Sequence, residues 1–337
     1  MIYAPTKAID SGSTIDEVSI RQLRLWSAPE IIMVATNLRD DLTILPHAIV
    51  QARQSSAKIL LVHVDEVSSH QSRLHNSWYQ QPTTRHSAVR ATLDRMAQQL
   101  RWVGITCEAT VLHGNPEEEL PLFAKTHSID RLLMGFGIDP DLTASRNRSF
   151  AERILPAMEV PVCVIGRNVS LSSPNGFKAK NITLAVSLNS DCHAQLGFAS
   201  RLAQEMHANL SVLHVAKCRD SRLDKSEHLP NEVMARLPLK AWREAELFCP
   251  TEIGVREGDP AMEILKHTSS QKEGAIILCS AGIASARQRW RNSISHRVLT
   301  EARYPVFIVE TRAAVMADSR KMPVFSDSQQ TFCEEIG

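Results

Sequence analysis

The stretch GAIILCSAGIASARQRWRNSISHRVLTEARYPVFIV, residues 274–309, decides the fold of this 337-residue chain. Its apolar runs at 276–279 and 306–309 predict two buried strands, and a helix is expected to begin near Asn292 and Ser293 between them. Small residues follow the first strand. A strand that leads through small residues to a helix amino terminus is typical of an anion site, because unpaired backbone N–H groups and the helix dipole point there.

The same pattern occurs earlier in the chain, so the sequence contains an internal repeat. The segments that recur are residues 132–135, 148–155 and 160–165 at a constant offset of 144, and residues 30–35, 48–52 and 58–64 at offsets of 150 or 151. In the first copy, five short apolar runs alternate with four helical patterns, which predicts a doubly wound parallel sheet. We therefore expect an α/β protein of two tandem domains, each a five-stranded parallel sheet with helices on both faces.

The limits of the domains follow from where these patterns stop. We expect an N-terminal extension over residues 1–28, domains over 29–168 and 180–312, and a disordered tail over 313–337. The segment between the domains is rich in Ser, Pro, Asn and Gly, which is typical of a linker. Long loops are expected at 66–86 and 217–240, where a lid or a partner surface would be built.

Composition argues against several classes of protein. The 38 basic and 37 acidic residues leave a formal net charge of +1, which disfavours a dedicated nucleic-acid binder or a polybasic membrane anchor. The seven cysteines include no C-x-x-C pair, and scattered cysteines suit a reducing compartment. No signal-peptide pattern opens the chain, and no run approaches about 18 apolar residues. We therefore expect a soluble, cytoplasmic protein without nucleic-acid or membrane partners.

With this repeated strand, loop and helix pattern, both halves resemble the domain of the universal stress protein family. The resemblance implies a flavodoxin-like (Rossmann-like) fold and an intramolecular pseudo-dimer, in which the last strands of the two domains pair across a pseudo-twofold axis. In nucleotide-binding members, a Gly-x-x-Gly sequence, nine further residues and a Gly-Ser or Gly-Thr pair hold the phosphates. An Asp after the first strand holds the adenosine end. Glycine lets backbone N–H groups approach phosphate oxygens without a Cβ in the way.

The second half keeps part of this motif with its spacing. The nucleotide-binding residues that the resemblance implies there are Ser187, Gly258, Cys279, Gly282, Asn292 and Ser293. Cys279 and Asn292 replace the first and third glycines, and Ser187 replaces the Asp. Asn tolerates left-handed backbone angles better than most residues, so Asn292 is a mild departure. Three arginines in the intervening loop, at 287, 289 and 291, either clamp phosphate or form a solvated face.

The first half departs further from the motif. The residues of its weaker site are Asn37, Gly114, Gly135 and Ser149. Ile138 and Arg148 stand where glycines are needed, and two aspartates, at 139 and 141, put negative charge into the loop that would receive phosphate. We therefore interpret the first half as a degenerate, structural copy and the second as the binder.

The leading hypothesis is a stress-response protein that binds adenine nucleotide in the second domain. The ligand would be ATP or AMP, with Mg²⁺ accompanying ATP, and the response would pass to an unknown protein partner. The alternative is a nucleotide-free scaffold with vestigial pockets, in which the long loops carry binding. Slow ATP hydrolysis is a third possibility. Other hydrolase chemistry has no support in the sequence, because no nucleophile-elbow sequence is present. The sequence leaves open whether two chains form a homodimer.

Each candidate residue also has a structural interpretation. Asn292 and Ser293 can cap a helix, and Gly114 and Gly258 are first of all turn glycines before a helix. Cys279 lies at a strand tip beside a helix amino terminus. It is either a reactive thiol of depressed pKa or, as we favour, a small apolar strand residue.

Histidines recur at matching strand positions, His63 and His214, and His113 precedes Gly114. A zinc or catalytic role would need partners that the sequence does not locate. We therefore interpret the histidines as packed and hydrogen-bonded, and we expect no metal site.

Overall fold

The computed structural model covers most of both repeats. It describes residues 27–38, 41–66, 82–137, 149–169, 178–187, 192–216, 251–271, 273–280 and 293–310. Outside the described residues lie the expected N-terminal extension (except residues 27 and 28), the expected tail and the 217–240 loop. So do Ile138, Arg148, Gly282, Asn292 and the three arginines of the second loop.

Strands and helices alternate along both halves. The first half consists of β1 (Ile31–Ala35), α2 (Asp41–Ser55), β2 (Lys58–Asp65), α3 (Pro82–Trp102), β3 (Cys107–His113), α4 (Pro116–Thr126), β4 (Arg131–Gly135), α5 (Phe150–Ile154), the 3-10 turn η3 (Leu155–Ala157) and β5 (Val162–Ile165). The second half consists of β6 (Asn181–Val186), α6 (His193–Met206), β7 (Asn209–Ala216), β8 (Thr251–Glu257), α9 (Pro260–Ser269), β9 (Gly274–Ser280), α10 (Ile294–Glu301) and β10 (Val306–Glu310).

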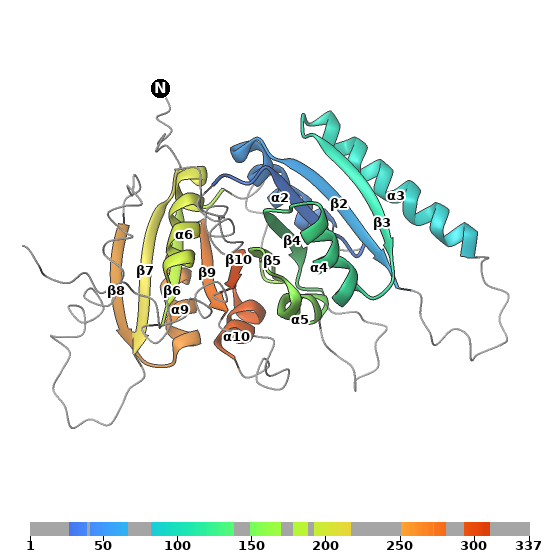
Figure 1. The fold of residues 1–337 in the computed structure, drawn as a ribbon. Helices are drawn as coiled ribbons and strands as arrows, with labels where there is room; N and C mark the ends of the chain where they lie inside the picture. Colours follow the sequence, from blue (N-terminus) through green and yellow to red (C-terminus); the bar gives the residue numbers. More distant parts are fainter. Residues whose placement is uncertain are drawn as a thin grey trace, which may run out of the picture.

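The ten strands of the described residues form one continuous sheet in the order β3-β2-β1-β4-β5-β10-β9-β6-β7-β8. Figure 1 shows the second half, coloured yellow to red, beside the blue and green first half, with β5 and β10 meeting between them. These two strands pair antiparallel, with Val306 opposite Val164 and Phe307 opposite Cys163, whereas neighbours within each half are parallel. The predicted pairing of the last strands is therefore confirmed, and the tandem halves fit an intramolecular pseudo-dimer.

Each half follows the strand order 3-2-1-4-5. This is the order of the Rossmann fold rather than the 2-1-3-4-5 order of flavodoxin, so the Rossmann-like name is the accurate one. The order reverses between β1 and β4 in the first half and between β6 and β9 in the second. Ligands of open α/β sheets bind outside the carboxyl ends of the strands at this reversal.

Two apolar cores, one on each face of the sheet, run through both halves. Helices α2, α3 and α6 cover one face, where Phe307 of β10 packs with Phe198 of α6. Helices α4, α5, α9 and α10 cover the other face. Strands buried on both faces need continuous apolar runs, which is why the sequence shows such runs rather than alternation.

Helix α3 begins at Pro82, inside the predicted 66–86 loop, so the expectation of a loop up to residue 86 is wrong at its end. Proline suits the first turn of a helix because its missing N–H would have no intrahelical partner there. Periodicity alone did not identify this polar first turn.

A buried ion pair joins the two halves where α2 and α6 meet the sheet. Nη2 of Arg131, at the start of β4, lies 3.2 Å from Oε2 of Glu205 at the end of α6, and both side chains are almost fully buried. Nη1 of Arg131 donates to Oε1 of Gln51 in α2 at 3.0 Å, and the guanidinium lies 5.3 Å from the ring centre of Phe198. In the repeat, Ala275 corresponds to Arg131, and Gln54 corresponds to Glu205. The pair therefore has no pseudo-symmetric copy.

A second polar contact marks the pseudo-twofold axis. Nε2 of His296 in α10 lies 2.6 Å from Oε1 of Glu152 in α5. These residues occupy the same position of the repeat, at the offset of 144. A position that meets its own counterpart lies at the axis, and a single chain can place an acid against a base there because the two copies are free to differ.

Candidate nucleotide site

Four of the candidate residues of the second half lie in the described part of the chain. Ser187 follows β6, and Cys279 is the second-last residue of β9, on the neighbouring strand. Ser293 caps α10, and Gly258 follows β8. Nη1 of Arg297 in α10 lies 2.8 Å from Oδ2 of Asp259, which ties the start of α9 to that of α10. Ser187 and Cys279 thus lie at the reversal of strand order, and the contact between Asp259 and Arg297 brings the turn at Gly258 towards the start of α10, which Ser293 caps.

Candidate residues of the first half take equivalent places. Asn37 lies two residues after β1, Gly135 ends β4 and is buried, Gly114 follows β3, and Ser149 caps α5. That these residues form a nucleotide site in either half stays a prediction. Ile138, Arg148, Gly282 and Asn292, on which the motif comparison depends, lie outside the described residues.

The amino terminus of α5 already carries an acidic side chain of the protein. Ser149 accepts a hydrogen bond from the backbone N–H of Glu152 at 3.1 Å, and Oε2 of Glu152 accepts one from the N–H of Ser149 at 2.7 Å. This reciprocal arrangement is a capping box. A buried carboxylate therefore satisfies the first free N–H of the helix and offsets its dipole.

The amino terminus of α10 differs at the same place. Ser293 accepts a hydrogen bond from the N–H of His296 at 3.1 Å, so the predicted cap is confirmed. The first turn of α10 has no acidic residue, because His296 stands where Glu152 stands in the first half. The first turn of α10 therefore has no capping carboxylate of its own, and the carboxylates of Glu152 and Asp259 reach this turn only through the side chains of His296 and Arg297.

Gly114 and Gly258 are turn glycines, as their structural interpretation predicts. Both have a φ of 141°, which L side chains rarely adopt. A Cβ at Gly114 would lie 2.9 Å from Oε1 of Glu119, and one at Gly258 would lie 3.2 Å from Cγ of Glu263. The requirement for glycine is therefore explained by the backbone conformation together with the close approach of Glu119 or Glu263, without a ligand.

We expect Gly114→Ala and Gly258→Ala each to lower the free energy of unfolding by about 1–2 kcal/mol, because a side chain strains this backbone conformation. Chemical denaturation would measure the loss. Gly104→Ala is a matched control, since Gly104 also has a positive φ, of 84°, but has no atom within 4 Å of the added Cβ. A loss at Gly104 much larger than at the other two would contradict this explanation.

Cys279 is a partly buried thiol that packs against the apolar core. Its Sγ lies 3.6 Å from the carbonyl oxygen of Ala185, and burial raises the pKa of the thiol to about 12. The interpretation of Cys279 as a low-pKa reactive cysteine is therefore wrong. The favoured one, a small strand residue, fits the contacts, and the four cysteines of the described residues are all free thiols.

His63 and His214 have equivalent structural roles. Nδ1 of His63 lies 2.9 Å from the carbonyl oxygen of Thr36, and Nδ1 of His214 lies 3.1 Å from that of Val186. Each ring thereby holds the carboxyl end of the first strand of its half against the second. The prediction of packed, hydrogen-bonded histidines is confirmed for this pair.

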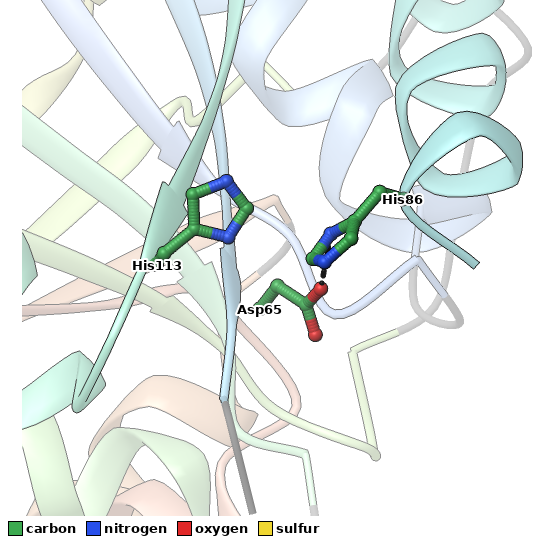
Figure 2. Close-up of side chains that lie close together, drawn as sticks. All are labelled: Asp65, His86 and His113. Atoms are coloured by element: carbon green, nitrogen blue, oxygen red, sulfur yellow. Dashed lines mark ion pairs between the residues drawn. The ribbon is translucent and has the colours of Figure 1, made fainter. Parts of the chain in front are cut away.

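One group of polar residues escaped the sequence analysis. Asp65, His86 and His113 lie within 4.8 Å of one another through their ligand atoms (Figure 2). The sequence named His113 but supplied no partner for it. One feature of the sequence could have indicated this group. Asp65 and His113 each end a predicted strand, and the two strands are consecutive and pair with these residues opposite each other.

The fold and the paired edges of the sheet define a tandem α/β protein of the Rossmann type. The model of the family described as "Universal stress protein family" matches residues 29–166 and 178–310. The chain belongs to this family, and the two matches make it a tandem universal stress protein.

Individual relatives agree with this assignment. Universal stress protein YxiE of Bacillus subtilis (strain 168) is 29% identical over 129 residues, which cover 34% of this chain and 87% of that protein. The structure resembles a universal stress protein of Archaeoglobus fulgidus DSM 4304, with a TM-score of 0.65, 16% identity, and coverage of 85% of this chain and 97% of the other. A putative universal stress protein of Pseudomonas aeruginosa UCBPP-PA14 gives a TM-score of 0.54 at 16% identity, over 86% and 95% of the chains.

Within the described residues, none of the helices combines the length and the apolar character needed to cross a membrane.

Proposed function

We propose that this universal stress protein binds an adenine nucleotide, AMP or ATP, in its second half and that its first half is a structural copy without a working nucleotide site. Mg²⁺ would accompany ATP as the counter-ion of the phosphates. The bound state would pass a stress signal to a protein partner in the cytoplasm.

The observation that carries the proposal is the difference between the two helix amino termini. In the first half the carboxylate of Glu152 already accepts from the start of α5 and sits where phosphate would bind. In the second half, the equivalent residue is His296, and no acidic residue of α10 itself caps its first turn. Glu152 and Asp259 contact the side chains of His296 and Arg297 there, so the backbone N–H groups at the start of α10 are not capped by a carboxylate of the helix. Phosphate at α5 would meet a buried like charge, whereas phosphate at α10 would meet the positive end of the dipole.

The position of the second site also supports nucleotide binding. Ser187 and Cys279 lie on neighbouring strands at the reversal of strand order, where nucleotides bind in this class of sheet. The adenosine end would contact Ser187 and the turn at Gly258, and the phosphates would lie against Gly282, Asn292 and Ser293. Ser187 offers a hydrogen bond to the ribose in place of the ionic acceptor that Asp supplies.

A paired substitution tests the proposal. Ser293→Ala and Ser149→Ala each remove an N-cap, so both should lower stability by about 1 kcal/mol without ligand. We expect AMP or ATP to raise the melting temperature of the wild type and of Ser149→Ala, and to raise that of Ser293→Ala much less, because only Ser293 would contact phosphate. A thermal-shift titration, with and without Mg²⁺, measures this.

The opposite pattern would contradict the proposal. Ligand stabilisation that Ser149→Ala removes and Ser293→Ala keeps would place the site in the first half. A flat titration in all three proteins would favour the scaffold alternative, in which residues 66–86 and 217–240 carry binding. Deleting residues 67–81, which precede α3, or residues 217–240 should then abolish binding of a defined partner in a pull-down.

A further inference from the structure

Three potential metal ligands meet at the far corner of the first half. Figure 2 shows Asp65, His86 and His113 directed into one space from β2, α3 and β3. Each supplies one ligand atom, and all three atoms lie within 4.8 Å of one another. The rings of His86 and His113 are 5.0 Å apart and meet edge to face.

The topology explains why these residues converge. Asp65 and His113 are the last residues of neighbouring parallel strands and are register partners, so their side chains leave the sheet on the same face. That face is the one that α3 covers, since Leu61 of β2 and Cys107 of β3 pack in the core formed with α3. The first turns of α3 bring His86 over the two strand ends.

His86 carries a buried ring nitrogen without a hydrogen bond. Nδ1 of His86 lies 2.9 Å from Oδ2 of Asp65, but the angles are not those of a hydrogen bond, and the atom is shielded from solvent. The carboxylate of Asp65 is itself buried, with a side chain 5% exposed. A ring nitrogen and a buried carboxylate that face each other without a good hydrogen bond are suited to sharing a cation.

We propose that Asp65, His86 and His113 bind a divalent transition-metal ion, with zinc as the representative ion. Two imidazoles and one carboxylate form a ligand set that zinc uses when a water or another ligand completes its tetrahedron. Imidazole nitrogen favours zinc and its neighbours over Mg²⁺, which prefers an octahedron of oxygen atoms. His113 is exposed, so the fourth position would open to solvent.

Small side-chain movements would complete the geometry. Bonds of about 2.0–2.1 Å to a tetrahedral ion separate neighbouring ligand atoms by roughly 3.3 Å. The contact between His86 and Asp65 is slightly shorter than this value, and all three ligand atoms lie within 4.8 Å of one another. A small adjustment of the exposed His113 ring and of the His86 contact would be needed to bring the three atoms to this spacing.

The site belongs to the first half alone. At the corresponding positions of the repeat, Ala216 stands for Asp65 and Glu257 stands for His113. The ends of β7 and β8 are therefore not expected to form a second copy of this metal site. The metal site is also separate from the proposed nucleotide site, because it lies on the other half of the sheet and shares no residue with it.

Metal titration of the full chain tests the proposal. The protein, without a polyhistidine tag, is stripped with a chelator and titrated with Zn²⁺ by calorimetry, with Co²⁺ as the spectroscopic probe. We expect one ion per chain, a visible absorption band of four-coordinate Co²⁺, and no binding of Mg²⁺. His86→Ala and His113→Ala should each weaken binding by roughly tenfold or more, since loss of even a supporting group costs that much.

Controls separate this site from the other histidines of the chain. His127→Ala removes an exposed histidine at the end of α4 and should leave binding unchanged. Neither His86 nor His113 is buried, so both metal-free variants should still fold. His113→Ala should melt close to the wild type, His86→Ala should melt lower because the buried carboxylate of Asp65 loses the His86 ring as a partner, and a single cooperative transition shows that each variant folds. Absence of Zn²⁺ binding, or binding that both variants retain at wild-type affinity, would overturn the proposal.

Discussion

Replacing Arg131 with alanine is expected to lower the free energy of unfolding by about 3–5 kcal/mol, because it leaves the carboxylate of Glu205 buried beside an empty space. Both side chains of this pair are at most 3% exposed. Nε of Arg201 lies 3.6 Å from Oε1 of Glu205, too far for a hydrogen bond, so Arg201 would replace the lost partner only in part. Because Arg131 belongs to the first half and Glu205 to the second, the loss should appear as a single cooperative transition at lower denaturant concentration.

A double substitution separates the burial of a charge from the loss of packing. Arg131→Met combined with Glu205→Met removes both charges and keeps apolar volume near Phe198, so it should cost much less than Arg131→Ala alone. A loss of less than about 1 kcal/mol in Arg131→Ala would contradict the account of this pair. Urea denaturation at neutral pH measures all three proteins.

Stability is also expected to fall as the pH drops from about 6.5 to about 4, through His47 of α2. Burial lowers the pKa of His47 from 6.5 to about 4, and the residue is 2% exposed. The unfolded chain therefore takes up a proton below pH 6.5 that the folded chain excludes until about pH 4. The contribution of this residue is complete above pH 6.5 and decreases by up to about 3 kcal/mol across the interval.

His47→Phe provides the control, since Phe198 occupies the corresponding position of the second half. The variant should lose less stability than the wild type between neutral pH and about pH 4.5. Denaturation curves at the two pH values give the difference. An identical acid dependence in both proteins would show that other groups control it.

Much of the fold was predictable from the sequence because the same pattern of strands and helices occurs in both halves of the chain. The apolar runs that precede Gly135 and Cys279 predicted strands at the centre of each half, and β4 and β9 occupy those places. The antiparallel pairing of β5 with β10 followed from the family resemblance. By contrast, the first turns of α3 are polar, and no hydrophobic period extends to Pro82. The strand order within each half required the structure, since the sequence alone leaves the choice between Rossmann and flavodoxin orders open.

The candidate sites were predictable only where the repeat applies. Ser149 and Ser293 were found because both copies keep a serine before the helix. The capping carboxylate of Glu152 distinguishes the two helices, but the same position holds a histidine in the second half, so the repeat gave no signal. The cluster of Asp65, His86 and His113 has no counterpart, and its members are distant in sequence. Only the strand register and the placement of α3 bring them together.

The two halves have therefore diverged in chemistry while keeping one architecture. Differences between paired positions, such as Glu152 against His296 and Arg131 against Ala275, stabilise the contact between the halves in ways that identical subunits cannot. The same divergence would leave the second half free to bind phosphate and the first free to bind a metal ion.

The stoichiometry of nucleotide binding tests the central claim most directly. Isothermal titration of the metal-free chain with AMP, and with ATP and Mg²⁺, is predicted to give one site per chain in the wild type. Gly282→Ile should abolish it, because a β-branched side chain would occupy the space of the phosphates, and Gly135→Ala should leave it unchanged. Two sites per chain, or one site that survives Gly282→Ile, would contradict the assignment of nucleotide binding to the second half.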